Sequence, residues 1–346
     1  MKTEMDMGSR AVAVSGLAKY FDTSRPWLNR LLEGAPKQVM RAVDDVSFSI
    51  ERGKTLALVG ESGCGKSTVA RLLVGLHQAT HGEIRVFGQD IGVVKTKAGK
   101  ALRQKIQMIF QDPYASLNPR WRIKRIIAEP MLEHQLVQGE AEIEKRVAEL
   151  IATVGLSTAD LNKYPHQFSG GQRQRISIAR ALATQPDFLV CDEPTSALDV
   201  SVQAQILNLM KDLQKNHGLT YLFISHNLAV VSYVADEVAV MYMGRSVEMA
   251  DKDSIFCAPL HPYTQMLLEA VPDLEMSGKA RQAPLGEVSS SSNPSRGCAF
   301  QPRCRHAVAR CAEERPEMRR VEHTLVACHL AKPQWLNARQ SASEGS

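Results

Sequence analysis

The sequence has little excess charge, few cysteines and no long apolar run that is free of charged residues. Its 42 Lys and Arg against 37 Asp and Glu leave a net charge of +5, so we expect no nucleic-acid partner. Residues 1–10 have no apolar core, which argues against a secretory signal. The most apolar long window, 219–243, contains His226, Asp236 and Glu237 and therefore favours strands over a membrane span. We expect a cytosolic protein, where seven cysteines predict no disulfide framework.

The sequence does contain a glycine-rich stretch that fits the phosphate-binding pattern G-x-x-x-x-G-K-[ST]. Its residues are Gly60, Glu61, Ser62, Gly63, Cys64, Gly65, Lys66, Ser67 and Thr68. An apolar run at 55–59 predicts a strand before it, and apolar residues at helical spacing follow it. The glycines let N–H groups face a phosphate, Lys66 adds a cation, and Ser67 offers a hydroxyl to Mg²⁺. A solvated glycine-rich turn is the alternative, which the flanking strand and helix disfavour.

Predicted strands and helices alternate along the chain, which indicates an α/β fold with a mostly parallel sheet. Residues 188–191 are an uninterrupted apolar run, typical of a strand that is buried on both faces. Asp192 at its end suits Mg²⁺ coordination, directly or through water, and Glu193 is placed to orient or deprotonate a water aimed at a γ-phosphate. Gln111 and His226 follow other predicted strands, so we expect them near the same metal and water.

A second glycine motif opens a predicted helix further along the chain. Its residues are Ser169, Gly170, Gly171 and Gln172. Exposed N–H groups at a helix N-terminus indicate a second anion site. One chain with two γ-phosphate sites makes sense if each site is split between two subunits.

The order of these motifs resembles that of the ATPase subunit of ABC transporters. The six motifs are the phosphate loop, Gln111, 169–172, 188–193, 196–199 and His226. The resemblance covers roughly residues 11–250 and implies a P-loop NTPase with the ABC ATPase fold, in an ATP-binding domain at 11–255. That fold has a RecA-like core, an antiparallel β subdomain and a helical subdomain, here at about residues 112–180. It implies that ATP and Mg²⁺ are bound and ATP is hydrolysed between two subunits arranged head to tail.

The resemblance also implies roles for single residues. Phe21 or, alternatively, Tyr20 would stack on adenine, and Asp199 would contact the opposite subunit. Mg²⁺ would be bound by Ser67, Gln111 and Asp192. Glu193 would be the catalytic base and His226 the switch histidine. Gln111 would also pass the state of the metal to membrane subunits.

Further stretches resemble the peptide-importer branch of this family, and within it the second ATPase subunit of bacterial dipeptide and oligopeptide importers. They are residues 111–119, 164–168, 261–264 and 297–304. The likeness implies a heterodimer with a paralogous ATPase, two permeases and a periplasmic or lipid-anchored binding protein. The chain would then lie at the cytoplasmic side of the bacterial inner membrane. Import of nickel, glutathione or another small solute stays open, as does a soluble ABC ATPase without a permease.

Residues 256–335 are predicted to form a C-terminal regulatory, cysteine-rich element, followed by a disordered tail at 336–346; residues 1–10 are also predicted to be disordered. Four of the seven cysteines lie in the last fifty residues of the chain, within this element: Cys298, Cys304, Cys311 and Cys328. So polar a segment needs a further source of stability, such as a metal centre. The spacing lacks the close cysteine pair usual for zinc, whereas four thiolates at wider spacing can hold a [4Fe–4S] cluster. The resemblance implies such a cysteine-rich C-terminal element. Zinc and no metal remain alternatives.

The loop after Gln111 is apolar for a connector, because it carries Tyr114, Leu117 and Trp121. We expect these side chains to line a groove that receives a short helix of a permease. Local packing within the helical subdomain is the alternative.

Overall fold

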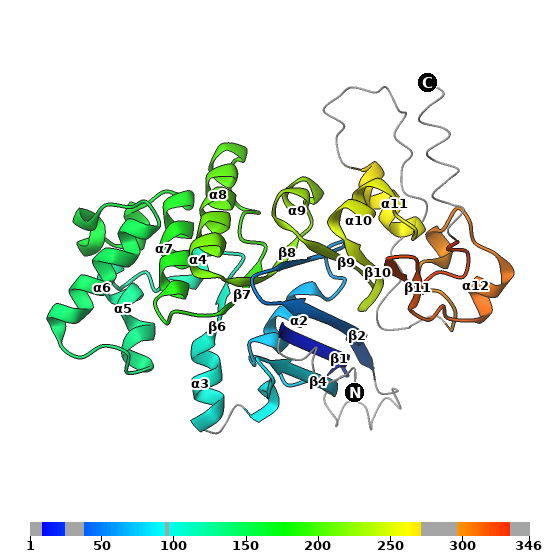
Figure 1. Ribbon diagram of the computed structural model, residues 1–346, viewed down its shortest axis with the longest axis horizontal. Helices are drawn as coiled ribbons and strands as arrows, with labels where there is room; N and C mark the ends of the chain where they lie inside the picture. Colours follow the sequence, from blue (N-terminus) through cyan, green and yellow to red (C-terminus); the bar gives the residue numbers. More distant parts are fainter. Residues whose placement is uncertain (1–8, 25–37, 94–96, 271–295, 333–346) are drawn as a thin grey trace.

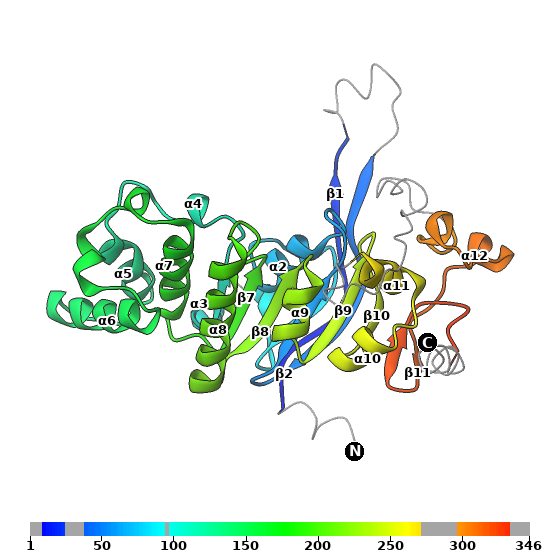
Figure 2. The same ribbon diagram turned by 90° about the horizontal axis from the view of Figure 1, so that it is seen from above.

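The computed structural model describes residues 9–24, 38–93, 97–270 and 296–332. The predicted disordered ends, 1–10 and 336–346, lie outside these ranges except for Ser9 and Arg10. A lobe of helices stands at one end of the molecule, a large sheet occupies the middle, and the C-terminal segment lies at the other end (Figure 1). Figure 2 shows the same order from above, with α6 and α12 at opposite ends.

The core is an eight-stranded sheet in the order β11-β12-β10-β9-β3-β8-β7-β6. Its strands are β3 (Thr55–Val59), β6 (Ile106–Ile109), β7 (Phe188–Asp192), β8 (Thr220–Ser225), β9 (Glu237–Tyr242), β10 (Arg245–Asp251), β11 (Arg319–Val321) and β12 (Thr324–Val326). From β9 to β6 the neighbours are parallel, and β10, β12 and β11 add antiparallel pairs. β3, β7 and β8 are buried along their whole length, which explains their apolar sequences. The predicted parallel α/β sheet is thus confirmed.

A second, antiparallel sheet packs against one face of this core, in the order β2-β1-β4-β5. Its strands are β1 (Arg10–Asp22), β2 (Val39–Glu51), β4 (His81–Val86) and β5 (Gln89–Asp90). Helix α2 (Lys66–Leu73) lies on the same face, and its Leu72 shares one apolar cluster with Phe48 of β2 and Leu58 of β3. The short turn η1 (Ile91–Val93) and α3 (Lys97–Lys105) lead from this sheet back to β6.

Helices cover the opposite face and form the lobe at the end of the molecule. The lobe holds α4 (Pro113–Ser116), α5 (Ile123–Glu133), α6 (Glu140–Thr153), η2 (Thr158–Asn162), η3 (Pro165–Gln167) and α7 (Gly170–Leu182). α8 (Val200–His217) and α9 (Leu228–Val234) follow on the sheet (Figure 1). Ile151 of α6, Ile176 of α7 and Phe223 of β8 belong to one apolar cluster, so the lobe and the sheet share a continuous core. Within the described ranges, every helix is too short or too polar to cross a bilayer.

The C-terminal segment continues the core sheet. It holds α10 (Lys252–Cys257), α11 (Pro262–Glu269), η4 (Gln301–Arg303) and α12 (Ala309–Glu313), followed by the hairpin β11–β12. Because β12 pairs with β10 at Glu248 and Met249, the hairpin extends the sheet that carries the phosphate loop. This brings residues near position 300 to within contact of residues near position 60.

Candidate functional site

The phosphate loop lies between β3 and α2, as its sequence predicts, and two of its glycines are required by close packing. Gly60 has φ 152°, and a Cβ there would stand 2.2 Å from the carbonyl oxygen of Met241. Gly65 has φ 108°, and its Cβ would stand 2.2 Å from the carbonyl oxygen of Ala42. Any larger residue would therefore displace the loop from β9 or β2.

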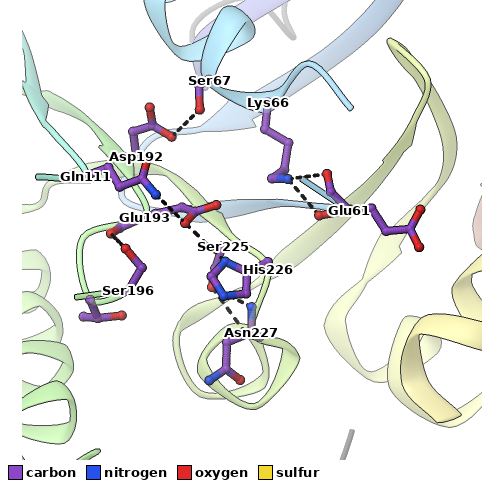
Figure 3. Close-up of polar contacts among 12 residues, drawn as sticks. Glu61, Lys66, Ser67, Gln111, Asp192, Glu193, Ser196, Ser225, His226 and Asn227 are labelled. Atoms are coloured by element: carbon purple, nitrogen blue, oxygen red, sulfur yellow. Dashed lines mark hydrogen bonds and ion pairs between the residues drawn. The ribbon is translucent and has the colours of Figure 1, made fainter. Parts of the chain in front are cut away.

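The ammonium of Lys66 lies over the start of this loop, and the residue is only 4% exposed. Its Nζ donates to the carbonyl oxygens of Gly60, at 2.7 Å, and Glu61, at 2.9 Å (Figure 3). These two acceptors offset the loss of water around a buried cation. The side chain of Glu61 points away from the ammonium (Figure 3), so this loop residue does not face Lys66 with its carboxylate. A cation beside backbone N–H groups at a helix N-terminus is suited to a phosphate group.

Ser67 and Asp192, both predicted to bind Mg²⁺, are in direct contact. The Ser67 hydroxyl donates to Oδ1 of Asp192 at 3.0 Å (Figure 3). Asp192 is 4% exposed, and burial raises the pKa of its carboxyl group above the ordinary value. A hydroxyl and a carboxylate are oxygen ligands of the kind that Mg²⁺ prefers, so this pair fits that metal.

The three residues predicted to be catalytic meet at one oxygen atom. Oε2 of Glu193 accepts a hydrogen bond from Nε2 of Gln111 at 3.0 Å and lies 3.2 Å from Nδ1 of His226 (Figure 3). Glu193 has φ 46°, a backbone conformation that is uncommon outside glycine, and its N–H donates to Ile224 at 3.0 Å. The surrounding strands hold this strained residue in place, as is frequent for residues at functional sites. The carboxylate is therefore fixed in orientation by residues from two neighbouring strand ends.

One cavity of about 660 Å³ connects the phosphate loop with Gln111, Glu193 and His226. Its lining includes Ser62, Gly63, Gly65, Lys66, Ser67, Thr68, Gln111, Glu193 and His226. The volume is within the ~300–1,000 Å³ typical of small-molecule sites. The lining also includes residues that the sequence did not suggest: Met40, Arg41, Ala42, Met243 and Gly244. They enter because β2 and the turn after β9 pass beside the loop, which no local pattern reveals.

The two aromatic candidates lie one strand away from this cavity. Phe21 pairs with Met40 and Tyr20 with Arg41 across β1 and β2. The Tyr20 hydroxyl donates to Oδ1 of Asp44 at 2.8 Å, and burial raises the pKa of Tyr20. Phe21 has no such polar tether, and the Lys19 ammonium lies 5.1 Å from its ring centre. The Phe21 ring also meets the His77 ring edge-on, with 5.6 Å between the ring centres, so both aromatic candidates have neighbours in this structure.

The second glycine motif belongs to another part of the molecule. Ser169 caps α7, since its Oγ accepts from the N–H of Gln172 at 3.3 Å while the Gln172 side chain accepts from the N–H of Ser169 at 3.0 Å. Asp199 caps α8, and the hydrogen bond from the N–H of Val202, at 2.9 Å, lowers the pKa of Asp199. α7 lies in the helical lobe, apart from α2 and its loop (Figure 1). Within one chain these residues and the cavity are separate, so the split site stays a prediction.

Four cysteines of the C-terminal segment line a second, smaller cavity. They are Cys298, Cys304, Cys311 and Cys328. Burial raises the pKa of Cys298 to about 11 and also raises the pKa of Cys304 and of Cys328. In the described part of the chain, however, no three His, Cys, Asp or Glu side chains are arranged to hold a metal ion. The predicted metal centre, whether a cluster or zinc, therefore gains no support from the side-chain positions.

The loop that was expected to receive a permease helix is only partly exposed. Leu117 is 1% exposed and belongs to the core of the helical lobe, so its predicted place in a docking groove is wrong. Trp121 packs against the same core. Tyr114 is 60% exposed, with the guanidinium of Arg173 lying 3.8 Å from its ring centre. Tyr114 is thus the most exposed of the three, and Trp121 is half-buried.

Comparison with known proteins shows which family the chain resembles. The family "ABC transporter" matches residues 43–196, and "Oligopeptide/dipeptide transporter, C-terminal region" matches residues 247–311. The dipeptide transport ATP-binding protein DppF of Escherichia coli (strain K12) is 52% identical, over 85% of this chain and 88% of that protein. The oligopeptide transport ATP-binding protein AppF of Bacillus subtilis (strain 168) is 49% identical, over 84% and 90%.

Solved structures share the same fold. A dimeric ATP-binding cassette in a post-hydrolysis state, bound to ADP and Pi, matches with a TM-score of 0.61 at 25% identity, over 70% of this chain and 98% of that one. CbiO1 from Clostridium perfringens, part of an ABC transporter complex, matches with a TM-score of 0.60 at 26% identity, over 72% and 92%.

Proposed function

Because the chain belongs to the ATP-binding proteins of ABC transporters, in their dipeptide and oligopeptide branch, we propose that it hydrolyses ATP to power peptide import. The observation that carries this proposal is the Glu193 carboxylate, whose Oε2 is shared by Gln111 and His226 beside the phosphate-loop cavity. An acid so oriented at the edge of a phosphate site is suited to accept a proton from an attacking water.

Three residues would carry the catalytic work. Glu193 takes the proton of the water that attacks the γ-phosphate. Gln111 and His226 hold the carboxylate, and His226, with its side chain 57% exposed, can also reach a γ-phosphate in the cavity. Since Gln111 lies between the end of β6 at Ile109 and the start of α4 at Pro113, a change at the metal could pass from it to the helical lobe.

The phosphates and the metal would be held by the loop. Lys66 leaves its two carbonyl acceptors for the β- and γ-phosphates, and the N–H groups of residues 60–68 surround the β-phosphate. Ser67, Asp192 and Gln111 would hold Mg²⁺. When bound, Mg²⁺ neutralises charge on the transferred phosphoryl group. Phe21, or alternatively Tyr20, stacks on adenine.

We propose further that the active form is a head-to-tail pair with a paralogous ATPase subunit. The separation of the α7 N-terminus from this chain's own cavity supports the idea, because the motif would otherwise have no ligand. Residues 169–172 and Asp199 would then face the partner's nucleotide. The dimeric state of a structurally similar cassette agrees with this arrangement.

The four C-terminal cysteines are proposed to hold a [4Fe–4S] cluster that orders their segment. The proposal rests on the cysteine count, since four thiolates are the ligand set of such a cluster, and not on their positions: the four line one cavity, but in the described residues no three of them are arranged to hold a metal ion. Zinc or no metal are the alternatives. Anaerobically purified protein should be brown and contain about four iron and four sulfide per chain. Stoichiometric zinc in colourless protein would replace the cluster, and protein with neither would leave the cysteines without a ligand.

The remaining parts of the proposal concern the whole transporter. Residues 11–255 form the ATPase domain and 256–335 the C-terminal element. Two permeases anchor the ATPase pair at the cytoplasmic side of the inner membrane, and a periplasmic or lipid-anchored protein delivers the peptide. Relatives named for dipeptide and oligopeptide transport support this assembly and solute class. Nickel and glutathione are the alternative solutes.

The experiment is purification of the full chain from membranes with its partners, followed by reconstitution in proteoliposomes. Mass spectrometry should find a second ATPase and two permeases. A dipeptide together with the binding protein should stimulate ATP hydrolysis and enter the vesicles, whereas nickel and glutathione should do neither. Stimulation by one of these two solutes alone would change the assigned substrate, and ATPase activity without any permease would refute the transporter.

A further inference from the structure

The second residue of the phosphate loop is bound to the far end of the chain. Both carboxylate oxygens of Glu61 accept from Arg303, at 2.7 Å from Nη1 and 2.9 Å from Nη2. Arg303 is 6% exposed, and the Glu61 side chain is 29% exposed. A two-pronged pair of this kind is among the stronger polar contacts in proteins and fixes direction as well as distance. The sequence separation of the two residues is 242 positions.

The backbone of Glu61 is held as firmly as its side chain. Its N–H donates to the hydroxyl of Tyr263 at 2.8 Å, and its carbonyl oxygen accepts from Lys66 at 2.9 Å. All three polar groups of this residue are thus engaged. Two of the three partners, Tyr263 and Arg303, come from the C-terminal segment and not from the nucleotide-binding motifs.

Arg303 and Tyr263 are themselves fixed by aromatic packing. The ring of Tyr263 lies 4.7 Å from that of Tyr242 and 5.4 Å from that of Phe300, measured between centres. The Arg303 guanidinium lies 6.0 Å from the Tyr242 and Phe300 ring centres. Arg303 also ends η4, directly before Cys304. Rotamers locked in this way can hold a neighbouring loop in one geometry.

We propose that Arg303 and Tyr263 are positioning residues, which hold Glu61 so that the phosphate loop is preformed for nucleotide binding. The inference rests on the proposed function, because it assumes that the loop binds ATP. The physical reason is that a loop already in its bound geometry loses less conformational freedom when the ligand arrives. The same geometry places Lys66 beside the loop, since the carbonyl of Glu61 is one of the two acceptors that Lys66 would leave for the phosphates.

A simple charge effect predicts something different, which allows a clean test. Removing the negative charge of Glu61 beside a triphosphate would by itself strengthen ATP binding, and removing the positive charge of Arg303 would weaken it. If the pair acts by positioning, both Glu61→Gln and Arg303→Gln weaken binding. The double variant then binds as weakly as either single one, because the contact can be lost only once. If charge alone acts, the two effects cancel.

The experiment measures the dissociation constant of MgATP for the full-length chain by fluorescence titration, with the unfolding temperature of each variant recorded. We expect about a tenfold weakening for Glu61→Gln, Arg303→Gln and the double variant alike, equal to ~1.4 kcal/mol. Arg305→Gln is the matched control, because Arg305 pairs with Glu269 at the surface, two positions from Arg303. It should bind as the wild type does. Tyr263→Phe, which loses only the hydroxyl, decides the matter if Arg303→Gln does not fold, and should bind several-fold more weakly.

The possible results distinguish a failure of the positioning role from a failure of the proposed ATP-binding function. Wild-type affinity in Tyr263→Phe and Glu61→Gln, or tighter binding in Glu61→Gln, would overturn the positioning role. Lys66→Ala serves as the reference for the site itself. If Lys66→Ala bound MgATP like the wild type, the nucleotide site would be wrong, whatever the Arg303 variants did.

Discussion

The phosphate loop is held from two sides that are built differently. On the side of the parallel strands, Lys66 and Ser67 line a cavity. Lys66 donates to a carbonyl oxygen of the loop and Ser67 donates to Asp192, and a bound ligand can replace both of these partners. On the C-terminal side, Tyr263 is fully buried and Arg303 nearly so, and neither lines that cavity. Side chains that bind a substrate must be accessible from the cavity. Side chains that fix the conformation of the loop are held more rigidly when they are buried. The comparison suggests a division between chemistry and support around a single loop.

The largest effect is expected on the side that does chemistry. Glu193→Gln keeps the shape of the side chain but cannot take a proton, so turnover should fall by about 10²–10⁴-fold. Binding of MgATP should remain. The measurement is the ATPase rate of the assembled complex, with Glu144→Gln as a control, because Glu144 forms an exposed ion pair with Lys124. Near-normal activity in Glu193→Gln would remove this residue from the mechanism.

A second substitution asks whether the chemical side extends into a partner subunit. A Cβ at Gly170 would meet only Leu198, at 3.6 Å, so the fold should tolerate Gly170→Asp. The added carboxylate would repel a triphosphate bound by the other subunit and lower ATPase activity of the pair by about 10–100-fold. MgATP binding to the isolated chain should not change. Gly170→Ala controls for backbone effects, and equal loss of binding in the isolated chain would refute the split site.

A smaller effect tests how the supporting side is built. Glu248 is fully buried and accepts from the N–H groups of Leu260, at 2.6 Å, and His261, at 3.1 Å. Burial raises the pKa of Glu248 from 4.5 to about 7. Between these values the folded protein keeps a proton that the unfolded chain releases, so stability is lost as the pH rises through this window.

Glu248→Gln cannot ionise and escapes that loss. It should be less stable than the wild type at pH 5, since an amide oxygen replaces only one of two acceptors. The difference in free energy of unfolding between the wild type and Glu248→Gln should be smaller by about 1–2 kcal/mol at pH 8 than at pH 5. Urea unfolding of both proteins at the two pH values measures the difference. Burial lowers the pKa of His261 to about 3, but this affects both proteins alike and cancels. A deficit that widened toward pH 8 would contradict the direction of the Glu248 shift.

Much of the chemical side could be predicted from sequence, for a physical reason. Strands of a parallel sheet deliver their carboxyl ends to one edge, so polar residues after apolar runs are brought together without knowledge of the loops. Gln111, Glu193 and His226 illustrate this, because each follows a strand of β6, β7 or β8 and all three meet at one oxygen. Ser67 and Asp192 follow the same rule.

The supporting side could not be predicted in this way. Nothing around Arg303 indicates that β12 pairs with β10, and that pairing is what carries the segment toward Glu61. Leu117 shows the complementary error. An apolar residue in a connector suggested a docking surface, yet the side chain fills the core of the helical lobe. Local sequence patterns report periodicity and composition. The Arg303–Glu61 contact and the burial of Leu117 both depend instead on which distant element packs against the residue.

The account's central claim is that Glu193 takes the proton that allows ATP to be hydrolysed in this site. The most direct test is the identity of the nucleotide retained by the assembled Glu193→Gln complex after incubation with MgATP. Rapid denaturation and chromatography should recover mainly intact ATP, while the wild type under the same conditions yields ADP. Recovery of mainly ADP from the Glu193→Gln complex, at the wild-type rate, would contradict the claim.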